Sequence, residues 1–186
     1  MDSRLSFDDH VTSVVRACNY HIRVLRHIRH LMDRETTNVI ACFIISSRLD
    51  YCNAILCGVT NRNVDLLKRV QNSLARVVYQ APYRSRTTQL RHSLHWLSIR
   101  QCIQYKIASM TFKVRLYHQP AYLSGLVVEH GQTRSLRSAN RNQALLVLPR
   151  IKAEIASRAF RVAAPKTWND LPLDIRITTS IRSFHQ

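Results

Sequence analysis

The sequence contains little glycine and little proline. Only three glycines and five prolines occur in 186 residues. A sheet built from many tight hairpins needs more of these turn residues, so the composition disfavours an all-β fold. Apolar residues make up 46% of the chain, which is enough for a core in one domain, or in one domain with an additional lobe. We therefore expect a mainly α-helical, bundle-like domain with a small irregular or short-strand carboxy-terminal part.

Long apolar runs are also missing. The longest, Val39 to Ile45, is far below the roughly 18 residues that span a bilayer. The amino terminus contains aspartates and lacks the apolar segment of a signal peptide. The five cysteines form an odd set without the spacing of a disulfide framework. We expect free thiols, an intracellular location that is either nuclear or cytoplasmic, and no membrane partner.

Acidic residues are scarce. Eleven acidic residues face 28 basic ones, so the net charge is +17, and all but five of the basic residues are arginine. The arginine side chain binds phosphates in a bidentate manner and stacks on bases, which favours nucleic acid as a partner. A merely solvated basic surface is the alternative interpretation.

Apolar residues recur at helical spacing through most of the chain. The repeats predict helices from Asp8 or Asp9 to about Met32, from Asp33 onwards, over Ser47 to Leu56, from Asn61 to about Tyr79, over Thr88 to His95, and from Ser98 to about Tyr117. The last of these has apolar residues on both sides, which indicates a central, mostly buried helix. Further along, the pattern predicts a basic loop over residues 129–143, a short strand over Ala144 to Leu148, a helix that begins at Pro165, and a helix capped by Ser180.

The same spacing predicts the residues of the core. They are Val15, Ile22, Leu25, Phe43, Leu67, Val70, Leu74, Trp96, Ile103, Met110 and Trp168.

Basic side chains recur on the faces opposite the apolar stripes. The expected nucleic-acid contacts are Arg16, Arg23, His27, His30 and Arg34 on the first helix, Arg62, Arg69 and Arg76 on the fourth, and Arg134, Arg137 and Arg141 in the basic loop. Such rows suit the tracking of a phosphate backbone. Asp65 shares the face of Arg69 and weakens the second row. For the loop set, a solvated linker is the alternative.

A metal site receives little support from the sequence. Cys52 and Cys57 precede His92 and His95, and a zinc site with two cysteines and two histidines is chemically possible. Two cysteines five residues apart on a helix do not share a face, however, so buried thiols and surface imidazoles are the better interpretation. We expect neither a metal nor a cofactor.

Four runs carry a resemblance to a known family. They are SRLDYCN at 47–53, RVQNSLARVV at 69–78, LHWLSIR at 94–100 and RAFRVAAPKTWNDLP at 158–172. In this order and spacing they resemble the carboxy-terminal, post-palm region of reverse transcriptases from animal non-LTR (LINE-type) retrotransposons, from about Leu5 to Phe184. The resemblance implies thumb-like helices that contact the backbone of RNA, DNA or an RNA–DNA hybrid, an upstream polymerase palm as a partner, and a parent RNA-directed DNA polymerase.

Catalysis by this chain alone is not expected. Reverse transcriptases hold two magnesium ions with adjacent aspartates in a strand turn, whereas the adjacent pair Asp8-Asp9 directly follows Phe7 and precedes a helical pattern. Helix capping is the better interpretation of this pair. The expected organisation is a helical thumb-like region over 1–128, a basic loop or linker over 129–143, and a segment over 144–186 that packs on the helices. Both ends look truncated relative to the family, so we expect a nucleic-acid-binding fragment. A protein-interaction or structural module and a decayed, non-functional copy are the alternatives.

Overall fold

Helices dominate the computed structural model, which describes residues 6–51, 53–130 and 144–184. The predicted fold class, mainly α, is confirmed. Within these residues, β-pairing is limited to an isolated antiparallel bridge between Glu129 and Leu146. The chain divides into two compact units, Met1–Ile103 and Gln104–Gln186. This division differs from the expected organisation into 1–128, 129–143 and 144–186, because it falls inside the long helix α6 (Ile99–Tyr117).

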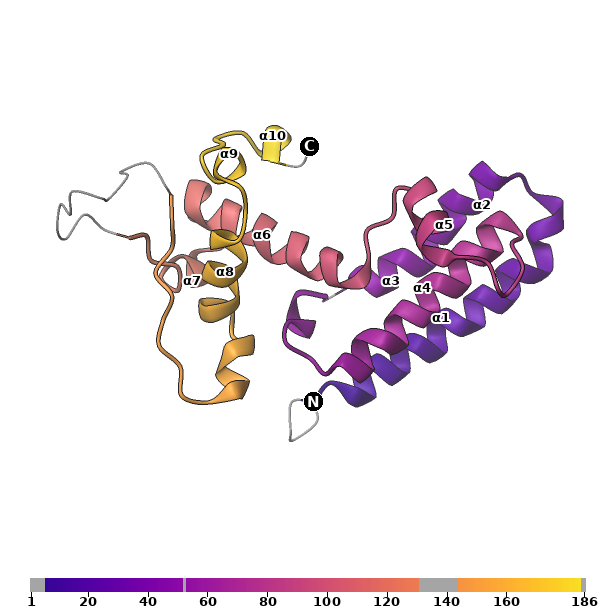
Figure 1. The fold of residues 1–186 in the computed structure, drawn as a ribbon, viewed down its shortest axis with the longest axis horizontal. Helices are drawn as coiled ribbons and strands as arrows, with labels where there is room; N and C mark the ends of the chain where they lie inside the picture. Colours follow the sequence, from indigo (N-terminus) through magenta and orange to yellow (C-terminus); the bar gives the residue numbers. More distant parts are fainter. Residues whose placement is uncertain (1–5, 52, 131–143, 185–186) are drawn as a thin grey trace. The chain divides into compact units, whose positions relative to one another are not determined.

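The first unit consists of helices joined by short turns (Figure 1). Its elements are α1 (Asp8–Ile28), a 3₁₀ turn (Arg29–Leu31), α2 (Arg34–Ala41), a π-helical turn (Cys42–Ser46), α3 (Ser47–Asp50), a 3₁₀ turn (Asn53–Leu56), α4 (Asn61–Tyr79), α5 (Thr87–Ser93) and the start of α6.

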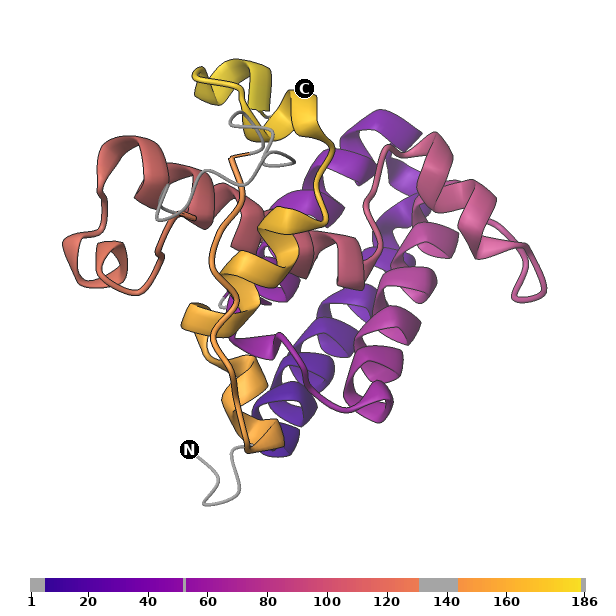
Figure 2. The same cartoon turned by 60° about the vertical axis from the view of Figure 1, so that its left-hand side comes forward.

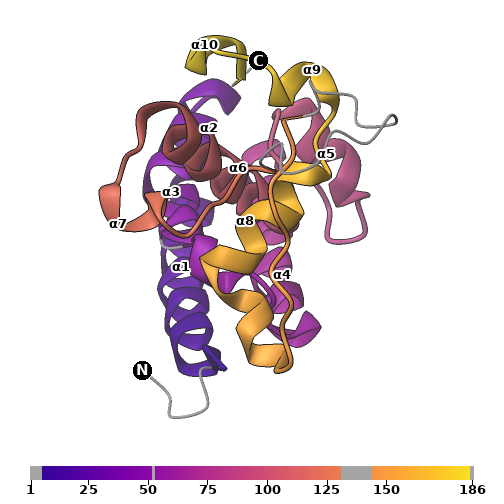
Figure 3. The same ribbon diagram turned by 90° about the vertical axis from the view of Figure 1, so that its left-hand side faces the viewer.

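The helices α1 and α4 lie side by side and run in the same direction (Figures 1 and 3). At their amino-terminal ends, Asn63 Nδ2 donates to the Ser6 carbonyl oxygen at 3.2 Å and to Asp8 Oδ1 at 2.8 Å. At the opposite ends, Arg29 follows α1 and donates to the carbonyl oxygen of Val78 in α4. Side chains therefore fasten the pair at both ends.

Local capping sets several of the helix ends. Asp33 caps α2 as predicted, because its Oδ1 accepts from the Thr36 backbone N–H at 2.7 Å. Ser98 and Gln101 form a reciprocal cap at the start of α6: the Ser98 N–H donates to Gln101 Oε1 at 2.9 Å, and the Gln101 N–H donates to Ser98 Oγ at 3.5 Å. At the end of α4, Gln80 adopts the left-handed conformation with φ 50°.

The predicted cap of α1 is wrong. Phe7, with φ 59°, is the residue that precedes the helix, so neither Asp8 nor Asp9 is the cap. Both aspartates lie in the first turn, where a negative charge is favourable beside the helix dipole. The α-helix itself ends at Ile28, and the 3₁₀ turn continues the helical backbone to Leu31, close to the predicted end at about Met32. Met32 is extended and leads the chain into the Asp33 cap.

Most of the predicted core of the first unit is confirmed. Ile22, Leu25, Leu67, Val70, Leu74 and Ile103 are buried, while Val15 and Trp96 are half-buried. Phe43 is a failure of the prediction, since 81% of its surface is exposed. It lies in the π-helical turn, which changes the register of the helix so that Ile45 takes the buried position.

The second unit contains the remainder of α6 and five shorter helical elements. These are α7 (Ala121–Ser124), a 3₁₀ turn (Glu154–Arg158), α8 (Phe160–Asn169), α9 (Leu173–Arg176) and α10 (Ile181–Phe184).

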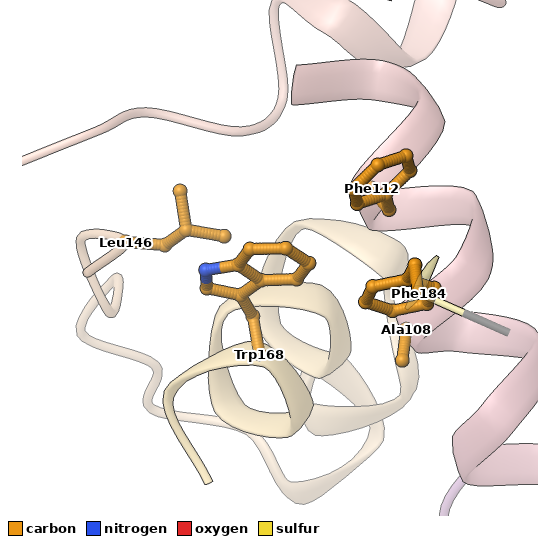
Figure 4. Close-up of a cluster of buried hydrophobic side chains, with 5 residues drawn as sticks. All are labelled: Ala108, Phe112, Leu146, Trp168 and Phe184. Atoms are coloured by element: carbon orange, nitrogen blue, oxygen red, sulfur yellow. The ribbon is translucent and has the colours of Figure 1, made fainter. Parts of the chain in front are cut away.

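An aromatic cluster forms the core of this unit (Figure 4). Trp168 is fully buried, as predicted, and stacks on Phe184 with ring centroids 6.0 Å apart. Phe184 in turn stacks on Phe112 of α6 at 4.6 Å. Leu146 packs in the same cluster, and Trp168 Nε1 donates to the Ala144 carbonyl oxygen at 2.8 Å. Residues on both sides of the expected linker therefore share one core.

Three details of the second unit differ from the predictions. Pro165 lies inside α8, because that helix begins five residues earlier, at Phe160. The strand predicted over 144–148 is reduced to the bridge at Leu146. Met110, predicted as core, is half-buried. Within the described residues, no helix has both the length and the apolar character needed to span a membrane.

Candidate nucleic-acid interface

The outer face of α1 carries a row of exposed cations. Arg16, Arg23 and His27 are exposed on the side of the helix opposite its buried residues, which are Val11, Cys18, Ile22 and Leu25. Tyr20 lies between them and is 65% exposed. Because the core occupies one side of α1, the basic side is free to contact a partner. We call Arg16, Arg23 and His27 the α1 row.

The remainder of the first predicted row departs from α1. His30 lies in the 3₁₀ turn, and Arg34 is the first residue of α2, so the prediction of a single helical row from Arg16 to Arg34 is wrong. The cause is the chain break at Met32 and Asp33. The exposed Arg34 instead places its guanidinium 5.3 Å from the centroid of the Tyr79 ring, at the end of α4.

The second predicted row, on α4, is uneven. Arg62 and Arg69 are exposed, as is Asp65. Arg76 is half-buried, and its guanidinium lies 5.1 Å from the centroid of the Tyr83 ring. The Nε of Arg76 is buried and has no hydrogen-bond partner among the described residues. Arg76 is therefore held between α4 and an aromatic ring, whereas Arg62 and Arg69 extend into solvent.

The structure brings two of the predicted residues, Arg34 and Arg76, to the same end of α4. Each lies over a tyrosine, Tyr79 for Arg34 and Tyr83 for Arg76. The sequence pattern placed the two arginines in separate rows and did not identify either tyrosine.

Arg29 is the residue that organises this end and that the predictions missed. It is buried, and its Nε and Nη2 donate to the Val78 carbonyl oxygen at 3.1 and 2.9 Å. Nε also approaches the Val77 carbonyl oxygen at 3.2 Å, and Nη1 donates to that of Met32 at 2.5 Å. A cation at the carboxy-terminal end of a helix satisfies free carbonyls and is favourable beside the dipole. The available signal was spacing, because Arg29 lies four residues after Leu25 and so continues the apolar stripe of α1.

Acidic side chains are missing from a long part of the sequence around this end. No aspartate or glutamate occurs between Asp65 and Glu129, while ten basic residues do. That stretch contains Arg76 together with Arg84 and Arg86, which are exposed in and beside the loop after α4. The chain therefore presents these cations without acidic neighbours in sequence.

The remaining predicted contacts, Arg134, Arg137 and Arg141, lie outside the described residues, so their contribution stays a prediction. Cys52, one of the four residues weighed for a zinc site, also lies outside the described residues. In the part of the chain that the structure covers, no three metal-ligating side chains gather. Asp8 Oδ1 accepts a hydrogen bond from Asn63, which gives this aspartate a structural role.

The thiols of two cysteines in the first unit are held in the protonated form. Burial raises the pKa of Cys18, although the nearby charge of Arg48 acts in the opposite direction. Burial also raises the pKa of Cys102, to about 11, and the carboxylate of Asp50 adds to this effect. A thiolate is the reactive form, so neither residue is a candidate nucleophile at neutral pH.

The second unit contains a pocket of about 590 Å³. Arg115 lies in its wall and is committed to internal contacts: Nη2 and Nε donate to Glu129 Oε1 at 2.7 and 2.9 Å, and the guanidinium lies 4.6 Å from the centroid of the Trp168 ring. The arginine is only 17% exposed in its side chain. It therefore supports the aromatic core and offers no free donor pair to a ligand.

An exposed apolar surface occurs on the first unit. Val39 is 62% exposed and Phe43 81% exposed on consecutive turns. Next to them in the chain, Ile40 and Ile44 line a small cavity of about 60 Å³ that Ile28 of α1 also borders. Exposed apolar surface of this kind is typical of protein contacts.

Comparison with protein-family models, with curated proteins and with solved structures gives no match for this chain. The relationship implied by the four sequence runs is therefore carried by those runs alone.

Proposed function

We propose that the first unit binds nucleic acid through the phosphate backbone. The α1 row carries this proposal, because its cations are exposed on one side of a helix whose other side is buried. Arg16 and Arg23 are seven residues apart, which is about 10 Å along a helix axis. That distance corresponds to about three nucleotides of one DNA strand, because each strand carries one phosphate per 3.4 Å of duplex axis. Contacts of this kind position a protein on a nucleic acid without selecting a sequence.

The proposal extends to the origin of the chain. In this proposal, the chain corresponds to the post-palm region of a non-LTR retrotransposon reverse transcriptase. It contacts the backbone of RNA, DNA or their hybrid, beside a polymerase palm where one is present. The chain alone is not a polymerase in this proposal, since the one adjacent aspartate pair lies in the first turn of α1 and Asp8 is bonded to Asn63. A helical, arginine-rich surface without catalytic acids supports this role.

A salt series tests the proposal. The whole chain is titrated against fluorescently labelled single strands, DNA duplexes, RNA duplexes and hybrids, and the affinity is measured by anisotropy. Backbone binding releases counterions, so the logarithm of the affinity is expected to fall linearly with the logarithm of the salt concentration, by about 0.9 per phosphate contact on duplex DNA. Absence of binding at low salt, or binding that salt does not weaken, contradicts the proposal.

A second candidate function is that of a protein-interaction module, which the exposure of Val39 and Phe43 favours. In that case the variant Phe43→Ser loses a protein partner and keeps its nucleic-acid affinity.

A third possibility, a decayed copy without function, predicts a chain without cooperative unfolding. Circular dichroism during urea titration separates it from the other two.

A further inference from the structure

The loop after α4 presents an unusually exposed aromatic ring. The Ser85 N–H donates to the Pro82 carbonyl oxygen at 3.0 Å and closes a turn whose middle residues are Tyr83 and Arg84. Figure 2 shows this loop, between α4 and α5, projecting from the ends of these two helices. The Tyr83 side chain at its tip is 87% exposed. A ring of this size is costly to leave in water, because its apolar surface is not buried on folding.

Arg76 supports the Tyr83 ring from one side. Its guanidinium lies 5.1 Å from the ring centroid, while the arginine itself is half-buried on α4. The Nε of Arg76 has no hydrogen-bond partner among the described residues, and the Tyr83 ring is the contact that the structure gives its guanidinium. A ring covered on one face by a cation still presents its other face to solvent.

The charges around the ring are those that a phosphate backbone requires. Arg84 is the next residue in the turn, and Arg86 follows the turn; both are exposed. The acid-free stretch between Asp65 and Glu129 surrounds them in sequence. Cations that flank an exposed aromatic ring form the arrangement by which proteins bind single strands, with bases stacked on the ring and phosphates beside the cations.

We infer that Tyr83 is a stacking platform for an unpaired base, so that the first unit binds single-stranded nucleic acid more tightly than duplex. This inference rests on the proposed function. Inside a duplex, both faces of a base are covered by its neighbours, so the ring can stack only on a base that is unpaired. Stacking on a tyrosine is tolerant of sequence, because every base has a π-face.

The test compares Tyr83→Ala and Tyr83→Phe in the whole chain. The probes are a single strand that carries a fluorescent adenine analogue and the duplex of the same sequence. Tyr83→Ala is expected to weaken single-strand binding by about 5- to 150-fold, which corresponds to about 1–3 kcal/mol per stacked base. The affinity for the duplex is expected to stay within about twofold, and Tyr83→Phe retains the stack. The analogue is quenched on binding to the wild type and stays bright with Tyr83→Ala.

Tyr122→Ala provides a matched control, because Tyr122 of the second unit is also highly exposed, at 76%. Its expected affinity for the single strand is that of the wild type. Salt-dependent binding that is equal in the wild type and Tyr83→Ala overturns the inference and leaves the proposed function standing. An equal loss in Tyr83→Ala and Tyr122→Ala also overturns it. A wild type that binds neither probe overturns both.

Discussion

The Arg29 guanidinium donates two hydrogen bonds to the Val78 carbonyl oxygen, from Nη2 at 2.9 Å and from Nε at 3.1 Å. These bonds join the residue after α1 to the last turn of α4, 49 positions later in the chain. Because Asn63 joins the other ends of the same two helices, Arg29 and Asn63 together hold α1 against α4. Arg29 is therefore a structural cation, in contrast to the exposed cations of α1, for which we propose a binding role.

Replacing Arg29 is expected to destabilise the protein markedly. Arg29→Met keeps the apolar stem of the side chain and leaves the carbonyls at the end of α4 without their charged donor, which costs about 3 kcal/mol. Arg26→Met removes a neighbouring exposed arginine of α1 and is expected to stay within about 0.5 kcal/mol of the wild type. Urea unfolding followed by circular dichroism measures both. Equal stability of the two variants contradicts the role assigned to Arg29.

The cap of α2 is expected to make stability depend on pH. Hydrogen bonding to the Thr36 N–H lowers the pKa of Asp33. A lowered pKa in the folded state means that the stabilisation is present above the unfolded pKa, about 3.9, and is lost as the pH falls through the folded pKa. Asp33→Ala is therefore expected to lower the unfolding temperature at pH 7, by a margin that shrinks towards pH 3.

Asp33→Asn is the matched control for this prediction, because asparagine also caps helices but does not titrate. Its advantage over Asp33→Ala is expected to be the same at every pH. A difference between the wild type and Asp33→Ala that does not change between pH 7 and pH 3 contradicts the prediction.

The Cys102 thiol is expected to react slowly. Because burial and Asp50 raise its pKa to about 11, only a very small fraction is thiolate at pH 8. In a variant whose other cysteines are alanine, the alkylation rate is expected to rise with pH up to about 11. In urea the same thiol is expected to titrate near 8.5. A folded protein whose alkylation rate levels off near pH 8.5 would show that the thiol is not held in this environment.

Features that depend on neighbouring residues were predictable from the sequence. The span of α4, Asn61–Tyr79, follows from apolar spacing. The cap of α2 follows from the Asp33 side chain, which accepts a hydrogen bond from the backbone N–H three residues later. The burial of Trp168 follows from its apolar neighbours. Each of these signals is local, so the sequence contains it in full.

Features that depend on distant residues were not predictable. The exposure of Phe43 follows from a π-helical turn, which inserts a residue into the helical repeat without a sequence signal that periodicity detects. The pairing of Arg34 with Tyr79 requires the turn at Met32 and the parallel packing of α1 and α4. The helical wheel therefore identified a face of α1 that is exposed, but it wrongly extended the row on that helix beyond His27.

The salt dependence of an α1 double variant tests the central claim most directly. Arg16→Gln with Arg23→Gln removes two exposed charges of the α1 row. Arg34 is left in place because it lies over Tyr79. A control removes the same charge from exposed positions of the second unit, as Lys152→Gln with Arg182→Gln. Helical content is expected to be unchanged in both variants.

The measurement is the slope of the logarithm of affinity against the logarithm of salt concentration on a single strand. The double variant of the α1 row is expected to lose about 1.4 from this slope, since each phosphate contact contributes about 0.7. The control is expected to keep the slope of the wild type. A slope that is the same in the wild type and in the α1 variant contradicts the claim that this face of α1 binds the backbone.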